Sequence, residues 1–96
     1  MNTPQQFKFI EGSFLPADAR KAILSLVAQK IQYHQLEVFS NTERFGHDVS
    51  HSQKRITELE VVYQEIKQLI DYAAENDLQI KVQSSIHITF DKAVSV

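Results

Sequence analysis

The sequence predicts an α+β domain in which two long helices lie between an N-terminal and a C-terminal strand. Apolar and polar residues alternate near both ends of the chain, whereas in the middle apolar residues recur every three or four positions. The 96 residues include only two glycines and two prolines, so turns must be few and elements long. We therefore expect the order β-α-α-β. A long antiparallel helical hairpin would pack on a small antiparallel sheet of the two terminal strands, which dimerisation completes.

Composition predicts one soluble domain over residues 1–96, with flexible ends at 1–5 and 92–96. The net charge of −2 lacks the strongly basic character of nucleic-acid-binding domains. The chain has no cysteine, which excludes disulfides, thiol nucleophiles and cysteine-ligated zinc. The start lacks the apolar core of a signal peptide, and no apolar run is long enough to cross a membrane. We therefore expect a cytoplasmic protein with no membrane partner.

The first strand is predicted within "QFKFIEGSF", residues 6–14. Phe7 and Phe9 would share one face and Lys8 would lie on the other, as in a half-buried strand. Gly12 is expected to end the strand after about six residues.

The first helix should run from about Pro16 to about Thr42. Proline suits the first helical position, and Asp18 lies in the first turn, where the helix dipole favours a negative charge. Helical spacing of apolar residues, with one histidine among them, predicts a buried stripe: Ile23, Val27, Ile31, His34 and Val38. His34 on this stripe is expected to be a core-edge histidine, hydrogen-bonded across a helix interface.

The second helix, from about Ser50 to about Asn76, has the clearest pattern in the chain. Alternating spacings of three and four define a coiled-coil-like core or dimer seam: Ile56, Leu59, Tyr63, Ile66, Ile70 and Ala73. Val62 and Leu69 widen this stripe and suggest a second contact. Lys67 and Asp71 are one turn apart and can form an ion pair.

The last strand, residues 80–90, alternates without a glycine or proline that could fold it into a hairpin. Ser84 and Ser85 mark the place for a bulge or a break. A strand of about eleven residues is almost twice as long as the first one, so half of its edge would be uncovered. We expect a second copy of the chain to cover that edge, through strands or through helices.

The stretch "ERFGHDVSHS", residues 43–52, is the one candidate metal site. His47 and His51 are four apart, and Glu43 could supply a third ligand. A turn explains the stretch better: Gly46 would end the first helix, and Ser50 and Gln53 fit a capping box for the second. We therefore expect no cofactor and no catalytic residue, and keep the metal as an alternative.

A second alternative places nucleic acid at the same end of the hairpin. Arg44, Lys54 and Arg55 could contact phosphates, although acidic neighbours and the absence of a nucleic-acid-binding motif argue against it. The favoured hypothesis is a small non-enzymatic interaction or structural protein that acts as a homodimer and binds a protein partner of unknown identity. A nucleic-acid accessory protein and a small metal-dependent enzyme or metal-binding protein are the alternatives.

Overall fold

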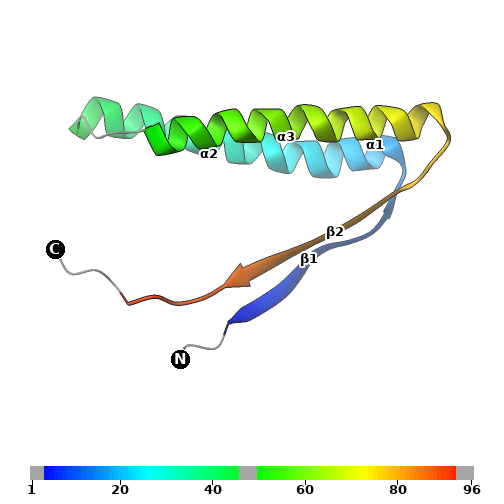
Figure 1. Cartoon of the computed structure of the whole chain (residues 1–96), viewed down its shortest axis with the longest axis horizontal. Helices are drawn as coiled ribbons and strands as arrows, with labels where there is room; N and C mark the ends of the chain where they lie inside the picture. Colours follow the sequence, from blue (N-terminus) through cyan, green and yellow to red (C-terminus); the bar gives the residue numbers. More distant parts are fainter. Residues whose placement is uncertain (1–3, 46–49, 93–96) are drawn as a thin grey trace.

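The computed structural model describes residues 4–45 and 50–92, with the backbone alone described for 41–45. The order of elements is the predicted β-α-α-β (Figure 1). Strand β1 is followed by a continuous helical segment and then by the long helix α3 and strand β2. Their bounds are β1 Gln5–Phe14, α1 Pro16–Ala19, η1 Arg20–Leu24, α2 Ser25–Phe45, α3 Ser50–Glu75 and β2 Ile80–Ile88. The predicted flexible ends lie largely outside the described residues.

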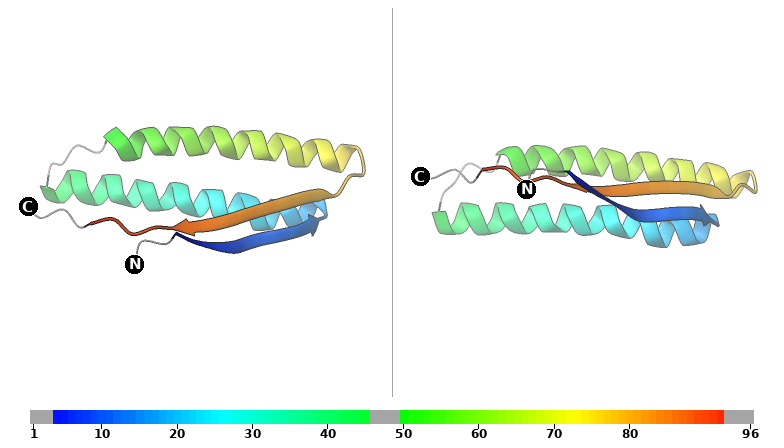
Figure 2. Two further views of the ribbon diagram at one scale, coloured as in Figure 1. Left: turned by 60° about the horizontal axis from the view of Figure 1, so that its bottom comes forward. Right: turned by 90° about the horizontal axis from the view of Figure 1, so that it is seen from below.

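The chain has the shape of a V with two arms. The antiparallel helices form the helical arm, and the paired strands form the strand arm, which diverges from the helices toward the termini (Figures 1 and 2). The apex is where β1 leads into α1 and α3 leads into β2. The radius of gyration is 17.3 Å, compared with about 12.5 Å for a compact domain of this length. The protein is thus a thin, open structure, 55 × 36 × 15 Å in extent.

Strand β1 is longer than the sequence suggested. It begins at Gln5 and continues to Phe14, which pairs with Ile80, so it extends along the whole of β2. Gly12 does not end the strand but pairs with Val82 in the middle of the ladder. The prediction that half of β2 would lack a partner strand is therefore wrong, because the strand tolerates this glycine.

An irregularity lies where the two serines suggested one, but the extra residue belongs to β1. Lys8 pairs with Ser85 and Ile10 pairs with Ser84, which leaves Phe9 unpaired. A residue inserted in this way shifts the alternation of side chains by one position. The face that carries Phe7 therefore continues with Ile10, and the prediction that Phe9 shares that face stays untested.

Helix one contains a π-helical segment, η1, that the sequence did not reveal. The helix begins as predicted at Pro16, where the N–H of Ala19 donates to the carbonyl of Leu15 at 2.9 Å. In a π-helical turn, residues five apart come closer to one face than in an α-helix. Ala19 and Leu24 are five apart, and both are almost fully buried, with exposed fractions of 0% and 5%. The segment thus allows both side chains to enter the core.

Helix α3 packs its apolar seam against helix one. The side chains of Leu59, Ile70 and Ala73 are buried, and those of Ile56, Tyr63 and Ile66 are half-buried. The stripe predicted on helix one, from Ile23 to Val38, is half-buried throughout. Whether the seam also contacts a second copy stays a prediction.

The end of α3 closes the apex. Asp77 adopts the left-handed conformation, with a φ of 55°, and the N–H of Leu78 donates to the carbonyl of Ala73 at 2.9 Å. This arrangement is a common helix stop, and it turns the chain into β2. Arg20 ties the two helices together through a 2.6 Å contact with Asp71, the residue that the sequence paired with Lys67.

The core is small and lies at the apex. It consists of Ala19, Leu24 and Ile70, with four half-buried neighbours packed on them: Phe14, Tyr63, Ile66 and Ile80. Among the described residues, no helix is long and apolar enough to cross a membrane.

Candidate interaction surface

The predicted metal site cannot be assembled from the described residues. His47 lies outside them, and so does the side chain of Glu43, while His51 is exposed in the first turn of α3. Elsewhere in the described chain no three histidine, aspartate or glutamate side chains come together in a way that could hold a metal ion.

The cations predicted to contact nucleic acid are only partly described. Lys54 and Arg55 are exposed near the start of α3, and neither forms an ion pair with another described residue. The side chain of Arg44 lies outside the described part. Two neighbouring cations form a small patch, well below the six to ten phosphate contacts that typically give tight nucleic-acid binding.

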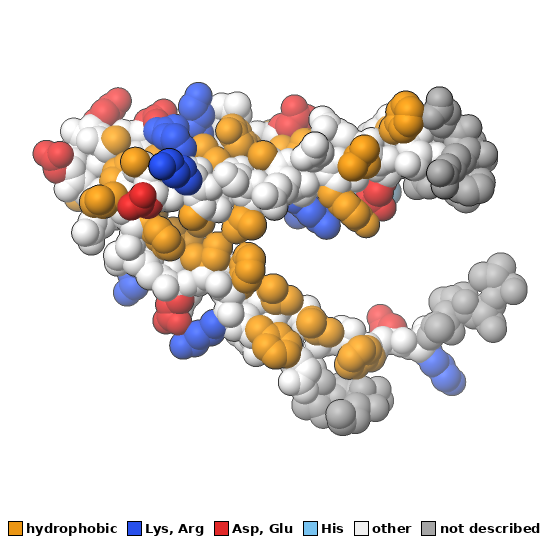
Figure 3. Space-filling view, turned by 180° about the vertical axis from the view of Figure 1, so that it is seen from behind, with side chains coloured by type: hydrophobic (Ala, Val, Ile, Leu, Met, Phe, Trp, Pro, Cys, Tyr) orange, Lys and Arg blue, Asp and Glu red, His pale blue; other side chains and the backbone are white. Residues whose placement is uncertain are grey.

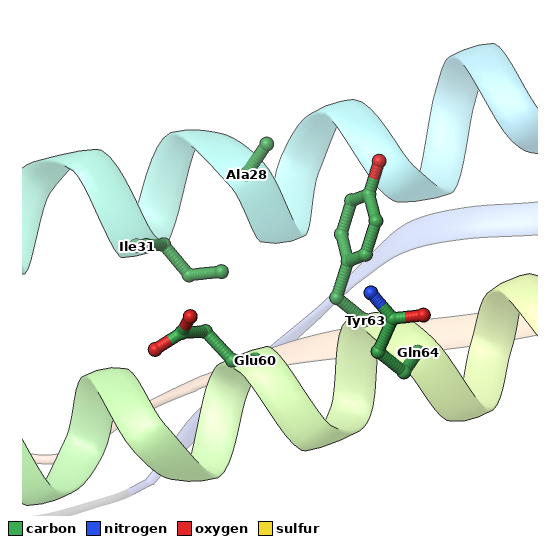
Figure 4. A pocket seen from close by; sticks show the side chains of 5 residues that line it. All are labelled: Ala28, Ile31, Glu60, Tyr63 and Gln64. Carbon is green, nitrogen blue, oxygen red and sulfur yellow. The ribbon is translucent and has the colours of Figure 1, made fainter.

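A shallow groove lies between α2 and α3 near the middle of the helical arm (Figure 4). It is lined by Ala28, Ile31, Glu60, Tyr63 and Gln64. Figure 4 shows the Tyr63 ring crossing toward α2, with the Glu60 carboxylate directed toward Ile31. Catalysis by a nucleophile requires a base within hydrogen-bonding distance, and no hydrogen bond joins these side chains.

The interior of the V presents a larger apolar surface. At the apex, a second groove is bordered by Ile23 and Leu69 on the helical arm and by Ile80 and Val82 on the strand arm. Leu69 is 67% exposed although it lines this groove. Val62 is seven residues before Leu69, two helical turns along the same edge of α3, and it is also exposed.

The strand arm continues this surface toward the mouth of the V. Phe7 pairs with Ile86 on the same face as Ile80 and Val82, and Ile88 follows two residues later. These three side chains are exposed, with fractions of 41–52%. Figure 3 shows hydrophobic side chains along the strand arm, facing the space between the arms. We call Phe7, Val62, Leu69, Ile86 and Ile88 the inner apolar surface.

A polar cluster borders this surface on α2. The Lys30 ammonium lies 4.5 Å from the centre of the Tyr33 ring, and His34 Nδ1 lies 3.0 Å from Glu37 Oε1. Lys30 is seven residues after Ile23 and thus continues the helix edge that lines the apical groove. The partner of His34 is a residue of its own helix, so the prediction of a hydrogen bond across a helix interface is wrong.

Apolar exposure extends beyond the interior. Fourteen large apolar or aromatic side chains of the described residues are exposed, whereas only three large ones, those of Leu24, Leu59 and Ile70, are buried. The widened stripe at Val62 and Leu69 suggested a second contact for α3, and both side chains are exposed on the inner apolar surface. The exposed strand residues of this surface were not predicted, because the sequence pattern does not show that the two arms diverge.

Comparison with known proteins gives no relative: no protein-family model, no curated protein and no solved structure matches this chain. The chemistry and geometry of its own surface therefore carry the functional argument.

Proposed function

We propose that the protein is a non-enzymatic interaction or structural protein that acts as a homodimer, with the inner apolar surface buried between two copies. The observation that carries this proposal is the area of exposed surface. The chain exposes 8020 Å², while a compact monomer of the same mass exposes about 5,600 Å².

The excess of about 2,400 Å² is large on the scale of protein interfaces. A standard interface takes about 800 Å² from each partner, and obligate homodimers take more. Part of this exposed surface is apolar, because the five side chains of the inner apolar surface are exposed, and contiguous exposed apolar patches mark contacts with other molecules. The small core points the same way, because association adds the burial that the single chain lacks.

A second copy is the simplest occupant for such a surface. The inner apolar surface lies on both arms. In a dimer with a two-fold axis, apolar side chains of each copy can therefore contact apolar side chains of the other. The open mouth of the V gives access to it (Figure 3). The cytoplasmic location predicted from composition and the unidentified protein partner stay predictions beside this proposal.

Sedimentation equilibrium over a hundredfold range of concentration tests the proposal. We expect twice the chain mass of 11.0 kDa at micromolar concentration. An Ile86→Asp variant should raise the dissociation constant at least tenfold, because each tenfold corresponds to about 1.4 kcal/mol and burying an unpaired carboxylate costs more. A wild-type chain that sediments as a monomer at all concentrations contradicts the proposal.

His87→Asp is the matched control. His87 is next to Ile86, is also exposed, and lies on the other face of β2, so the same charge there should leave the dimer intact. Circular dichroism of both variants checks that each is folded. If both substitutions dissociate the protein to the same extent, the effect is one of charge and not of the inner apolar surface.

A further inference from the structure

The sheet has two outer edges, and only that of β2 is suited to pairing with another strand. Within the described residues the sheet consists of β1 and β2 alone. The edge of β1 is interrupted by the extra residue Phe9, and bulges of this kind protect edges from further pairing. Strand β2 is nine residues long, without a bulge, glycine or proline, and its described outer edge has no strand partner.

The sequence of β2 is self-complementary about its central residue. On the inner face, two apolar residues stand on either side of Ser84, in the order Ile80, Val82, Ser84, Ile86, Ile88. An antiparallel pair of β2 strands centred on Ser84 would therefore place Ile80 opposite Ile88 and Val82 opposite Ile86. Apolar pairs directly opposite each other are the ones that stabilise antiparallel ladders.

The outer face is compatible with the same register. Lys81 would lie opposite His87, and Gln83 would lie opposite Ser85. Lys81 is the one lysine of the strand, which has no arginine, aspartate or glutamate, so this register does not place two lysines opposite each other.

Ser84, the central residue of this pattern, has a side-chain hydroxyl without a partner. Its Oγ is buried and has no hydrogen-bond partner among the described residues. A buried hydroxyl left unpaired is unfavourable, so such groups nearly always find a partner. In the chain itself, the residue opposite Ser84 is Ile10, which has an apolar side chain.

We propose that two copies of the chain pair through the free edges of β2, antiparallel and centred on Ser84. The two-fold axis places Ser84 opposite Ser84 of the second copy, where rotation of the side chain about χ1 would let one hydroxyl donate to the other. The result is a four-stranded sheet in the order β1-β2-β2-β1. This inference rests on the proposed homodimer and specifies its geometry.

The proposed register is compatible with the open V shape of the chain. Ile80 lies at the apex and Ile88 toward the mouth (Figure 1), so antiparallel pairing sets the mouth of one copy beside the apex of the other. A two-fold axis perpendicular to the sheet keeps both helical arms on the same side. The part of each strand arm near the mouth of the V, which its own helices do not cover, thus comes next to the part of the second copy's sheet near the apex, which is covered by helices.

Single cysteines test the register, since the natural chain has none. Residues directly opposite in an antiparallel pair have Cα atoms about 4.5–5.5 Å apart, within the range of a disulfide. We expect Ser84→Cys to form a covalent dimer on mild oxidation. Ser85→Cys and Gln83→Cys are matched controls. In either variant the two equivalent cysteines of the dimer would have Cα atoms about 8 Å apart, too far for a disulfide. A mixture of the two variants should cross-link, because residue 83 of one copy lies opposite residue 85 of the other.

Spin labels at two exposed positions give a second measurement that leaves Ser84 unchanged. Lys81 and His87 are each three residues from the centre, so both label pairs should show the same separation of about 20 Å along the strand. If the two β2 strands pair around any residue other than Ser84, the distance between the two labels at position 81 differs from the distance between those at position 87.

The outcomes separate the two proposals. A protein that is monomeric by sedimentation refutes both. A dimer in which Ser84→Cys does not cross-link and the two label distances differ refutes the register but leaves the homodimer. A dimer that cross-links equally at positions 83, 84 and 85 also refutes it, because only parallel or sliding strands would do so.

Discussion

The apical core should be the most sensitive point of the fold, and Ile70→Ala tests it. Ile70 is 2% exposed and is the largest side chain that is fully buried among the described residues. It packs with Ala19 and Leu24 of helix one and lies in the same cluster as Phe14 and Ile80 of the two strands. Truncation of one side chain therefore weakens every contact at the apex.

The expected loss is a large fraction of the total stability. Truncating a buried isoleucine to alanine removes about 2–5 kcal/mol, because it removes apolar burial and leaves a cavity. A chain of this length has a free energy of unfolding of about 5–14 kcal/mol. Because only five apolar side chains of the described residues are buried, the free energy of unfolding should lie near the low end of this range, so the variant is expected to be partly unfolded at 37 °C.

Urea unfolding, followed by circular dichroism at one fixed protein concentration, measures the change in the free energy of unfolding. Leu36→Ala is the matched control, since it shortens a side chain of the same volume that is 61% exposed on α2. Surface substitutions of this kind usually change stability by less than about 0.5 kcal/mol. A loss below about 1 kcal/mol for Ile70→Ala would refute the view that the apex holds the two arms together.

Three further substitutions test other parts of the structure. Ile66→Asp puts a carboxylate into the half-buried centre of the helix seam; we expect unfolding or complete dissociation, and a wild-type melting curve would show that the seam is wrong. Asp71→Asn weakens the contact with Arg20. Because both side chains are more than 40% exposed, the loss of folding free energy should be below about 1 kcal/mol and should be smaller at high salt. A larger loss in thermal melts would show that this ion pair is more than a surface contact. Gly12→Ala should be neutral or stabilising by up to about 1 kcal/mol, because a Cβ there would meet only the Phe14 ring at 3.9 Å; a lower melting temperature would contradict the observed strand.

The sequence predicted the helices well, because their signals are local. Periodicity and Pro16 placed the start of helix one at the observed residue, and α3 begins at Ser50 as expected and ends one residue early, at Glu75. Periodicity placed the end of helix one at about Thr42, whereas the helix stop predicted at Gly46 agrees with the observed end of α2 at Phe45. Helix ends depend on capping contacts that periodicity does not encode.

The features that the sequence did not reveal depend on tertiary packing. The segment η1 brings Ala19 and Leu24 to one core, and β1 continues through Gly12 because β2 pairs with it there. Neither choice is favoured by local preferences, since glycine weakens a strand and π-helical turns are rare. The candidate site shows the same limit: the metal and nucleic-acid hypotheses concern a turn whose residues 46–49 are not described, while the exposed inner surface follows from the divergence of the two arms.

The dimer stays a proposal, but the observations that support it differ from those expected from the sequence. An uncovered half of β2 was expected, and that expectation is wrong because β1 pairs along all of β2. Instead, apolar side chains are exposed on the face of the sheet, and Ser84 Oγ, at the centre of a self-complementary strand, is buried without a hydrogen-bond partner among the described residues. A two-stranded sheet is marginally stable by itself, and the apical core is small. Folding of the strand arm should therefore depend on association, so that its melting rises with protein concentration while the helical arm changes less.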